Sequence, residues 1–419
     1  MARYSSRDHR LVALIRWNPE EPATRVNDYV LQSQGVSCAF VVASDSGDLV
    51  INTGMPAEGE RHRERFEQML GRPLDVKAIV LTQSHPDHGG GWSAFAGPDT
   101  RTFVQREFPR LWEERQDLAP FFAPRVRKVI PGSAMPVTHQ AAWHTRLPPI
   151  PGVTTFADSM EFQAGGRRVV LYSTPSGETL DNVVVHLPEQ RMAFIGNLMG
   201  ALPGALPHFY TIRGDRDRSL VRFISDMDLL LGLELETLVL GHGEPIVGAE
   251  RVRAFLAKVR DAVKHIHAET VAGMVAGKDL ATLMREIRLP AHLTPETGRG
   301  RLSWYVRAMW DELTGPYRLD SVTEMYEVPQ RAVWADLVEL AGAGALVDRA
   351  RRHAEAGHPV EALHLLDMVI AGEPGHAAAR RLEIAAIDQL IEAGRGENSD
   401  EQAWLETQQA DARAALGEN

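Results

Sequence analysis

The first 250 residues contain short apolar runs rich in β-branched side chains, and each run ends in a polar or glycine-rich loop. Examples are VKAIVLTQS, RRVVLYSTP, NVVVHLP, RMAFIGN and LETLVLGHG. CAFVVASDSGDLVINTG predicts a β-hairpin, because two further apolar runs meet at the polar turn of residues 45–48. Such strands, interspersed with amphipathic helices like GERHRERFEQML, predict layered sheets with helices outside. The polar residues after the strands are then expected to gather at one edge.

From about residue 250 the pattern changes to helix. AERVRAFLAKVRDAVKHIHAETVAGMVAG and PQRAVWADLVELAGAGALVDRARRHAEAG place apolar residues at a period near 3.6. GHPVEALHLLDMVIAGEPG has the spacing of the second helix of a tetratricopeptide unit. One such unit cannot bury its own apolar face, so it is expected to pack on neighbours or on a second subunit. The predicted parts are a layered domain over 1–250, a helical region over 251–340 and a tetratricopeptide-like region over 341–419.

The composition limits the partners and the compartment. The formal net charge of −11 argues against nucleic acid or an anionic membrane surface as the main partner. Cys38 is the single cysteine, so neither a disulfide framework nor a cysteine cluster for zinc is expected. The first residues lack the apolar core of a signal peptide, and no apolar run is long enough to span a bilayer. We therefore expect a soluble, cytoplasmic protein that acts on a small molecule.

Metal-binding residue types crowd together at the end of one predicted strand. In LTQSHPDHGGGW, residues 81–92, His85, Asp87 and His88 lie within four residues. Imidazole and carboxylate groups together suit zinc, manganese or iron. The glycines let the backbone turn sharply and approach an ion closely. A polar loop with incidental histidines is the alternative, and the attached glycines and the preceding buried strand favour the metal site.

This region resembles the metallo-β-lactamase superfamily, whose signature is histidine-x-histidine-x-aspartate-histidine followed by glycines. Gln83 stands where the first histidine is usual. INTG at 51–54 resembles the superfamily's aspartate-threonine-glycine strand end, with Asn52 in place of the aspartate. LGHGEP at 240–245 carries His242, which matches the last histidine ligand. The resemblance implies a metallo-β-lactamase-like αββα sandwich as the catalytic domain, in an α/β chain that continues into an all-α region.

Within the superfamily the chain is similar to the alkyl sulfatase group. Glu178 in TPSGETLDN fits that group's glutamate ligand, and Asn197 falls where its next acidic ligand is expected. The helices after residue 250, including RGRLSWYVRAMW, resemble the group's dimerisation domain and imply a homodimer.

The resemblance implies two metal positions. One consists of Gln83, His85 and Glu178, and the other of Asp87, His88 and His242, with Asn197 in place of a bridging carboxylate. Neutral amides are weak ligands for zinc. We therefore expect one well-held ion at the Asp87 position, with partial or no occupancy of the other. Zinc, as one or two ions, is the expected cofactor, and iron and manganese are alternatives.

The resemblance also implies roles in hydrolysis. A bound metal lowers the pKa of its water towards 7, and Asp87 is the residue expected to orient that water and collect its proton. HFYTIRGDRDRS resembles a segment of the sulfatase group, so Tyr210 and Arg213 are candidate substrate-binding residues, although Arg213 can equally pair with a neighbouring aspartate. Trp304 and Tyr305 replace the group's histidine-asparagine pair, which makes Trp304 a candidate substrate contact and Tyr305 a candidate proton donor.

Two classes of function follow from these expectations. The first is a metal-dependent hydrolase of an anionic or ester-like small molecule, similar to an alkyl sulfatase but with altered metal ligands. The second is a member of the superfamily that binds a ligand or a partner without turnover. A redox or lyase enzyme with a mononuclear iron site lies between the two.

Overall fold

The computed structural model describes residues 15, 18–129, 146–202, 204–210, 212, 218–296, 300–394 and 397–418. These residues form two compact units. The larger unit ends at Leu313, and the smaller unit consists mainly of residues 314–419. Each unit is described by itself below. The part of the chain that the structure describes contains no helix long and apolar enough to cross a membrane.

The first sheet of the larger unit has seven strands in the described residues, in the order β1-β2-β3-β4-β5-β6-β7. They are β1 (Thr24–Arg25), β2 (Val30–Ser33), β3 (Ala39–Val42), β4 (Asp48–Ile51), β5 (Val76–Val80), β6 (Arg101–Gln105) and β7 (Val153–Phe156). Strands β1 to β4 pair antiparallel, and β4 to β7 pair parallel. Phe40 pairs with Ile51 across β3 and β4, so the predicted hairpin is confirmed.

The second sheet has six strands in the described residues, in the order β13-β12-β11-β10-β9-β8. They are β8 (Ser159–Ala164), β9 (Arg167–Ser173), β10 (Val183–Leu187), β11 (Met192–Phe194), β12 (Thr237–Val239) and β13 (Ile246–Val247). All neighbours pair antiparallel except β11 and β12, which are parallel.

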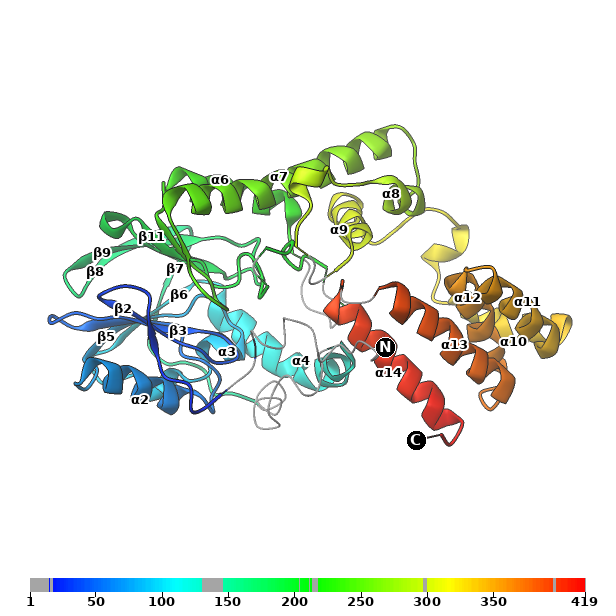
Figure 1. The fold of residues 1–419 in the computed structure, drawn as a ribbon, viewed down its shortest axis with the longest axis horizontal. Coiled ribbons are helices and arrows are strands. Elements are labelled where there is room, and N and C mark those ends of the chain that lie inside the picture. The colour runs from blue at the N-terminus through cyan, green and yellow to red at the C-terminus, as the bar shows by residue number, and fades with distance from the viewer. Residues whose placement is uncertain are drawn as a thin grey trace. The chain divides into compact units, whose positions relative to one another are not determined.

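The two sheets face each other across a shared core, and helices cover their outer faces (Figure 1). Phe40 of β3 packs edge-on against Phe194 of β11, with 5.3 Å between ring centroids. Helices α2 (Gly59–Leu70), α3 (Pro86–Gly89) and α4 (Phe108–Val129) lie along the first sheet. Helices α6 (Leu220–Gly232) and α7 (Ala249–Val275) cover the second sheet. The predicted αββα sandwich is therefore confirmed.

Further helices complete the larger unit. They are η2 (Trp92–Ala94), η3 (Pro188–Gln190), α8 (Leu280–Glu286), η4 (Ala291–Leu293) and α9 (Leu302–Thr314). Tyr305, Val306 and Met309 of α9 join the same hydrophobic cluster as the inner faces of α6 and α7. Met309 follows Val306 by three positions and Tyr305 by four, so the three side chains share one apolar face of the helix.

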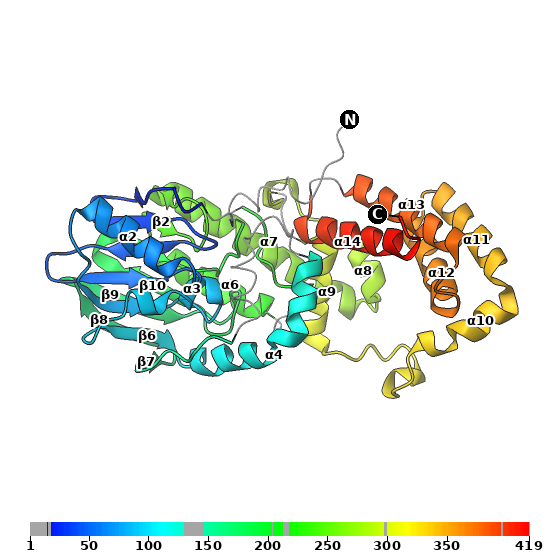
Figure 2. The same ribbon diagram turned by 90° about the horizontal axis from the view of Figure 1, so that it is seen from below.

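The smaller unit is helical, as the periodicity predicted (Figure 2). It contains η5 (Val322–Met325), η6 (Gln330–Val333), α10 (Trp334–Ala341), α11 (Ala343–Glu355), α12 (Pro359–Gly372), α13 (Ala377–Ala393) and α14 (Ser399–Ala415). Val347 and Ala350 of α11 pack against Ala362 and Leu366 of α12, and small residues allow this close contact. The boundaries at residues 250 and 340 stay predictions.

An apolar surface of the smaller unit is exposed over the segment 317–340. Its members are large side chains that are each at least 45% exposed: Tyr317, Leu319, Val322, Met325, Tyr326, Val328, Val333, Leu337 and Leu340. We call this set the exposed apolar segment. Exposed apolar side chains that gather on one segment can mark an interaction site.

Candidate metal centre and adjoining cleft

Loops that follow strands of both sheets supply the side chains of the candidate metal centre. His85, Asp87 and His88 follow β5 at the start of α3, Asn197 follows β11, and His242 follows β12. The last two loops touch each other so closely that a Cβ atom on Gly241 would lie 2.9 Å from the carbonyl oxygen of Gly196. Glycine is required for this approach, and it brings the side chains of separate strands together.

Asp87, His88 and His242 converge in a buried group. One ligand atom from each lies within 4.8 Å of the others. The Asp87 Oδ2 atom is 3.5 Å from Nε2 of His88 and 3.9 Å from Nε2 of His242. Among the described residues, neither Asp87 Oδ1 nor His88 Nε2 has a hydrogen-bond partner. Buried polar atoms without partners are rare unless an ion or water satisfies them. The donor set therefore fits a divalent cation.

Burial also sets the protonation states of this group. It lowers the pKa of His88 and of His242 to about 4. Both imidazoles are therefore neutral at neutral pH, which is the form that binds a metal. Burial raises the pKa of the Asp87 carboxyl, and His85 and His242 oppose that rise.

Asn52 fixes the orientation of His88. Its Oδ1 atom accepts hydrogen bonds from the backbone N–H (2.9 Å) and the hydroxyl (3.0 Å) of Thr82. Its Nδ2 atom therefore faces Nδ1 of His88 at 2.9 Å and donates to it. Because Nδ1 accepts, the proton of the neutral ring sits on Nε2, where a cation would bind. Metal binding then requires the Asn52 amide to turn, and this leaves the Thr82 N–H without an acceptor, at a cost of about 1–3 kcal/mol.

We expect Asn52→Asp to tighten zinc binding by about 10- to 100-fold. One aspartate oxygen would accept a hydrogen bond from the Nδ1–H group of His88, while the other oxygen would keep the hydrogen bond from Thr82. The dissociation constant for zinc, measured by competition with a chelator, checks this expectation. Asn182→Asp is the matched control, since Asn182 bonds to Thr174 instead and its replacement should leave the affinity unchanged. An affinity equal to that of the wild type in Asn52→Asp would contradict the tautomer assignment.

A second buried group lies beside the first and contains Gln83, His85, Glu178 and Asn197. Glu178 is its centre: the Oε2 atom accepts from Nδ2 of Asn197 at 2.6 Å and from Nε2 of Gln83 at 3.4 Å. The Gln83 Nε2 atom also lies 3.0 Å from Nδ1 of His85. Arg218 forms an ion pair with the other carboxylate oxygen, with Nη2 at 3.4 Å from Oε1. This position is therefore rich in N–H donors.

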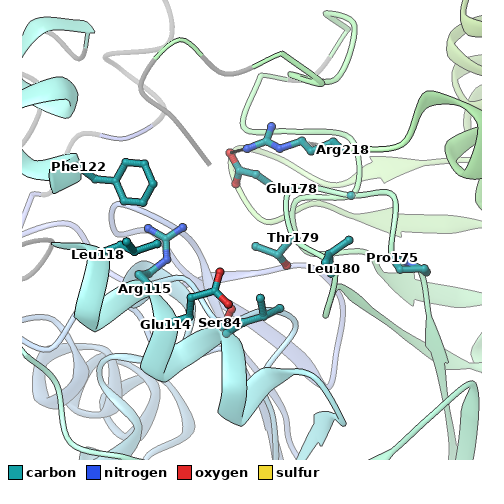
Figure 3. Close-up of a pocket in the computed structure, with 12 residues that line it drawn as sticks. Ser84, Glu114, Arg115, Leu118, Phe122, Pro175, Glu178, Thr179, Leu180 and Arg218 are labelled. Atoms are coloured by element: carbon teal, nitrogen blue, oxygen red, sulfur yellow. Dashed lines mark ion pairs between the residues drawn. The ribbon is translucent and has the colours of Figure 1, made fainter. Parts of the chain in front are cut away.

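A cleft that is partly open to solvent adjoins Glu178 (Figure 3). Arg115, Leu118 and Phe122 project into it from α4. The opposite wall comes from the loop between β9 and β10 and from Arg218. The full lining is Ser84, Leu111, Glu114, Arg115, Leu118, Phe122, Pro175, Gly177, Glu178, Thr179, Leu180 and Arg218. The cleft thus combines apolar walls with two arginines and two glutamates.

The other candidate residues from the sequence analysis either do not line the cleft or lie outside the described residues. Arg213 lies outside the described residues. Tyr210 and Trp304 contact each other, with 6.4 Å between ring centroids. The Tyr305 hydroxyl donates to the backbone carbonyl of Leu206 at 3.2 Å, and its ring is buried in the hydrophobic core. Of the described residues, those lining the cleft include none of these three aromatic residues, and their roles stay predictions.

Sequence reasoning missed Arg115 and Arg218. Arg218 lies at the end of the run RGDRDR, so its charge was visible, but the sequence did not single it out from its neighbours. Arg115 lies in an ordinary amphipathic helix, and only the packing of α4 beside the loop after β9 brings it to the cleft.

Comparison with known proteins agrees with this fold. The metallo-beta-lactamase superfamily profile matches residues 34–242, and the alkyl sulfatase dimerisation profile matches residues 280–411. The chain belongs to the metallo-β-lactamase superfamily. Within it, the combination of the two matches places the chain in the alkyl sulfatase-like group.

Similar proteins include a linear primary-alkylsulfatase of a Pseudomonas species, 25% identical over 72% of this chain and 60% of the relative. The alkyl/aryl-sulfatase BDS1 of Saccharomyces cerevisiae is 22% identical over 87% of this chain and 60% of the relative. The chain thus spans 60% of the length of both relatives. The stereoselective inverting sec-alkylsulfatase Pisa1 from Pseudomonas sp. has the same fold, with a TM-score of 0.78 and 20% identity over 95% of this chain and 66% of that one.

Proposed function

We propose that the protein is a metal-dependent hydrolase that cleaves sulfate esters of small apolar alcohols. The observation that carries this proposal is the buried Asp87–His88–His242 group. The second buried group touches it where Asn197 meets His242, and Glu178 of that second group lines a cleft with Arg115 and apolar walls. The sulfatase names of the relatives support the choice of sulfate over other anions. Zinc is the proposed cation, with iron and manganese as alternatives.

Different residues of the chain are assigned to activating the water, binding the sulfate and excluding solvent. A divalent cation in this group supplies Lewis acidity and acidifies a water molecule that it binds. The Asp87 carboxylate, with one oxygen that lacks a partner among the described residues, orients the attacking water and accepts its proton. Arg115 binds the sulfate, because a planar guanidinium donates two hydrogen bonds to an oxyanion. Leu118, Phe122 and Leu180 exclude water around the alcohol portion.

The direct test is release of inorganic sulfate from a panel of primary and secondary alkyl sulfates by the zinc-loaded protein. We expect turnover of at least one member, and we expect a chelator to abolish it. Phosphate monoesters and neutral carboxylic esters of the same alcohols form the comparison panel. Hydrolysis of the neutral esters with no release of sulfate would overturn the assignment of substrate class.

We also propose that the protein is a homodimer that buries the exposed apolar segment. The match to the alkyl sulfatase dimerisation profile includes this segment, and the apolar residues there are unusually exposed for a single copy. Val322 is 83% exposed and Leu340 is 85% exposed. Burial of such side chains against a second copy contributes about 25 cal/mol per Å² of apolar surface.

We expect Val322→Glu/Leu340→Glu to dissociate the dimer, because a charged side chain is costly to bury in an apolar interface. Light scattering at micromolar concentration measures the mass of the particle. Val275→Glu is the matched control: Val275 is 85% exposed in the larger unit, outside the exposed apolar segment, and its replacement should leave the mass unchanged. A monomeric wild type would refute the proposal.

A second candidate function is binding without turnover. It is favoured by the three neutral amides, Asn52, Gln83 and Asn197, that occupy positions where the resemblance implies aspartate, histidine and an acidic ligand. Metal content separates the two candidates. Near-stoichiometric metal that is lost in His88→Ala supports the hydrolase, whereas a folded protein without metal supports the binding protein.

A further inference from the structure

We infer that the second metal position implied by the superfamily is closed in this chain. The ion pair of Glu178 and Arg218 occupies that position, and the amide groups of Gln83 and Asn197 hold the Glu178 carboxylate in place. The inference rests on the proposed function in one respect: it takes Asp87, His88 and His242 as the group that holds the cation. The centre is then a single-ion centre, and Glu178 is a structural residue rather than a ligand.

The orientation of Asn197 is the first argument. Its Nδ2 atom donates to Oε2 of Glu178 at 2.6 Å, and it lies farther, at 3.2 Å, from Nε2 of His242, the nitrogen that the single cation would take instead. The amide oxygen points the opposite way, towards Gly241, where a Cβ atom would lie only 2.2 Å from it. An amide NH₂ has no lone pair to offer a cation. Asn197 therefore presents donors at the place where a bridging ligand would need to present an acceptor.

Gln83 extends the same pattern. Its Nε2 atom lies 3.0 Å from Nδ1 of His85 and 3.4 Å from Oε2 of Glu178. The Nδ1 atom of His85 lies between this amide nitrogen and Oε2 of Glu178, which is 3.4 Å away, so it is engaged inside the group. The Gln83 side chain thus holds two of the groups that a second cation would need.

Arg218 supplies the positive charge. Its side chain is 3% exposed, that of Glu178 is 4% exposed, and the two face each other at the rim of the cleft (Figure 3). A buried carboxylate needs a compensating charge, and the Arg218 guanidinium provides it. A second divalent cation beside this guanidinium would leave the buried centre with a large uncompensated positive charge. A second divalent cation is therefore disfavoured twice: it lacks ligands, and the Arg218 guanidinium repels it.

Zinc stoichiometry tests the inference without measuring activity. The purified protein is stripped with a chelator, reloaded with excess Zn²⁺, desalted and analysed for zinc per chain. We expect one equivalent in the wild type and one in Glu178→Gln, and none in His242→Ala. Two equivalents in the wild type, with one lost in Glu178→Gln, would overturn this inference and leave the proposed function standing. A wild type that takes up no zinc, and no iron or manganese when it is reloaded with those ions in parallel, would overturn the proposed function and the single-ion centre with it.

A variant that restores the ligand types provides the converse test. We expect Gln83→His/Asn197→Asp/Arg218→Gln to bind two equivalents of zinc, because it replaces the donors with ligands and removes the repelling charge. Circular dichroism confirms that the variant is folded. A folded triple variant that still binds one equivalent would show that these side chains are not what closes the position.

Discussion

Replacement of His242 by alanine is expected to remove the bound metal and to lower kcat/KM for the best sulfate ester by at least ~10³-fold. His242 is one of three groups that converge on one point, and its Nε2 atom lies 3.9 Å from Oδ2 of Asp87. Two remaining ligands hold a cation poorly, and the cation contributes several kcal/mol to the reaction. Since each 1.36 kcal/mol is a factor of ten, a loss of this size follows. Asp87→Ala is expected to behave in the same way.

Zinc analysis and steady-state kinetics on the same sample measure this loss. His186→Ala is the matched control, because His186 is also buried but lies on β10 and is not part of the converging group. It should keep both metal and activity.

Gln83→Ala should lose much less metal and activity than His242→Ala, because the Gln83 amide is not expected to be a ligand. Equal losses of metal and activity in His242→Ala, Asp87→Ala and Gln83→Ala would show that Gln83 does coordinate the metal.

Arg115→Ala is expected to raise KM for a sulfate ester by about 10- to 100-fold, with a smaller change in kcat. A hydrogen bond to a charged group contributes about 1.5–3 kcal/mol, which corresponds to this range. Arg115 reaches the cleft from α4, on the wall opposite the loop that carries Glu178 (Figure 3). Arg218 is committed to the Glu178 carboxylate, so its loss should act on stability as well as on binding.

The dependence of KM on the charge of the substrate distinguishes this role from a structural one. Arg115→Lys should recover part of the affinity, because a charge remains but the paired donors are lost. Arg168→Ala removes an exposed cation that pairs with Glu161 on the second sheet, and it should leave KM unchanged. An equal rise in KM for sulfate esters and for a neutral inhibitor of the same cleft would argue against anion binding by Arg115.

The fold could be predicted from the sequence because the hydrophobic pattern that specifies its strands and helices is local. β-Branched runs of strand length, separated by turns and amphipathic helices, predict layered sheets, and the hairpin at residues 45–48 follows from two apolar runs around a polar turn. The candidate metal ligands could be predicted from the sequence for a related reason. Asp87 and His88 are neighbours in the sequence, and His242 stands between two glycines after a strand, where the resemblance placed it.

The remaining parts of the site depend on contacts between distant segments. The sequence shows that Asn52, Gln83 and Asn197 are amides, but not which way each amide points. Thr82 decides this for Asn52, and the Glu178 carboxylate decides it for the other two. Arg115 and Arg218 lie 103 positions apart, and the packing of α4 beside the loop after β9 brings both to one cleft.

The sequence by itself therefore determined the layered fold and the superfamily, because strand periodicity and motif spacing are properties of short stretches of chain. It also supplied the candidate metal ligands, which stay predictions. Only the tertiary structure decided the hydrogen-bond direction of each amide, the partner of Glu178 and the arginine that faces the cleft. Those depend on which groups far apart in the chain meet in a buried space, where each donor must find an acceptor.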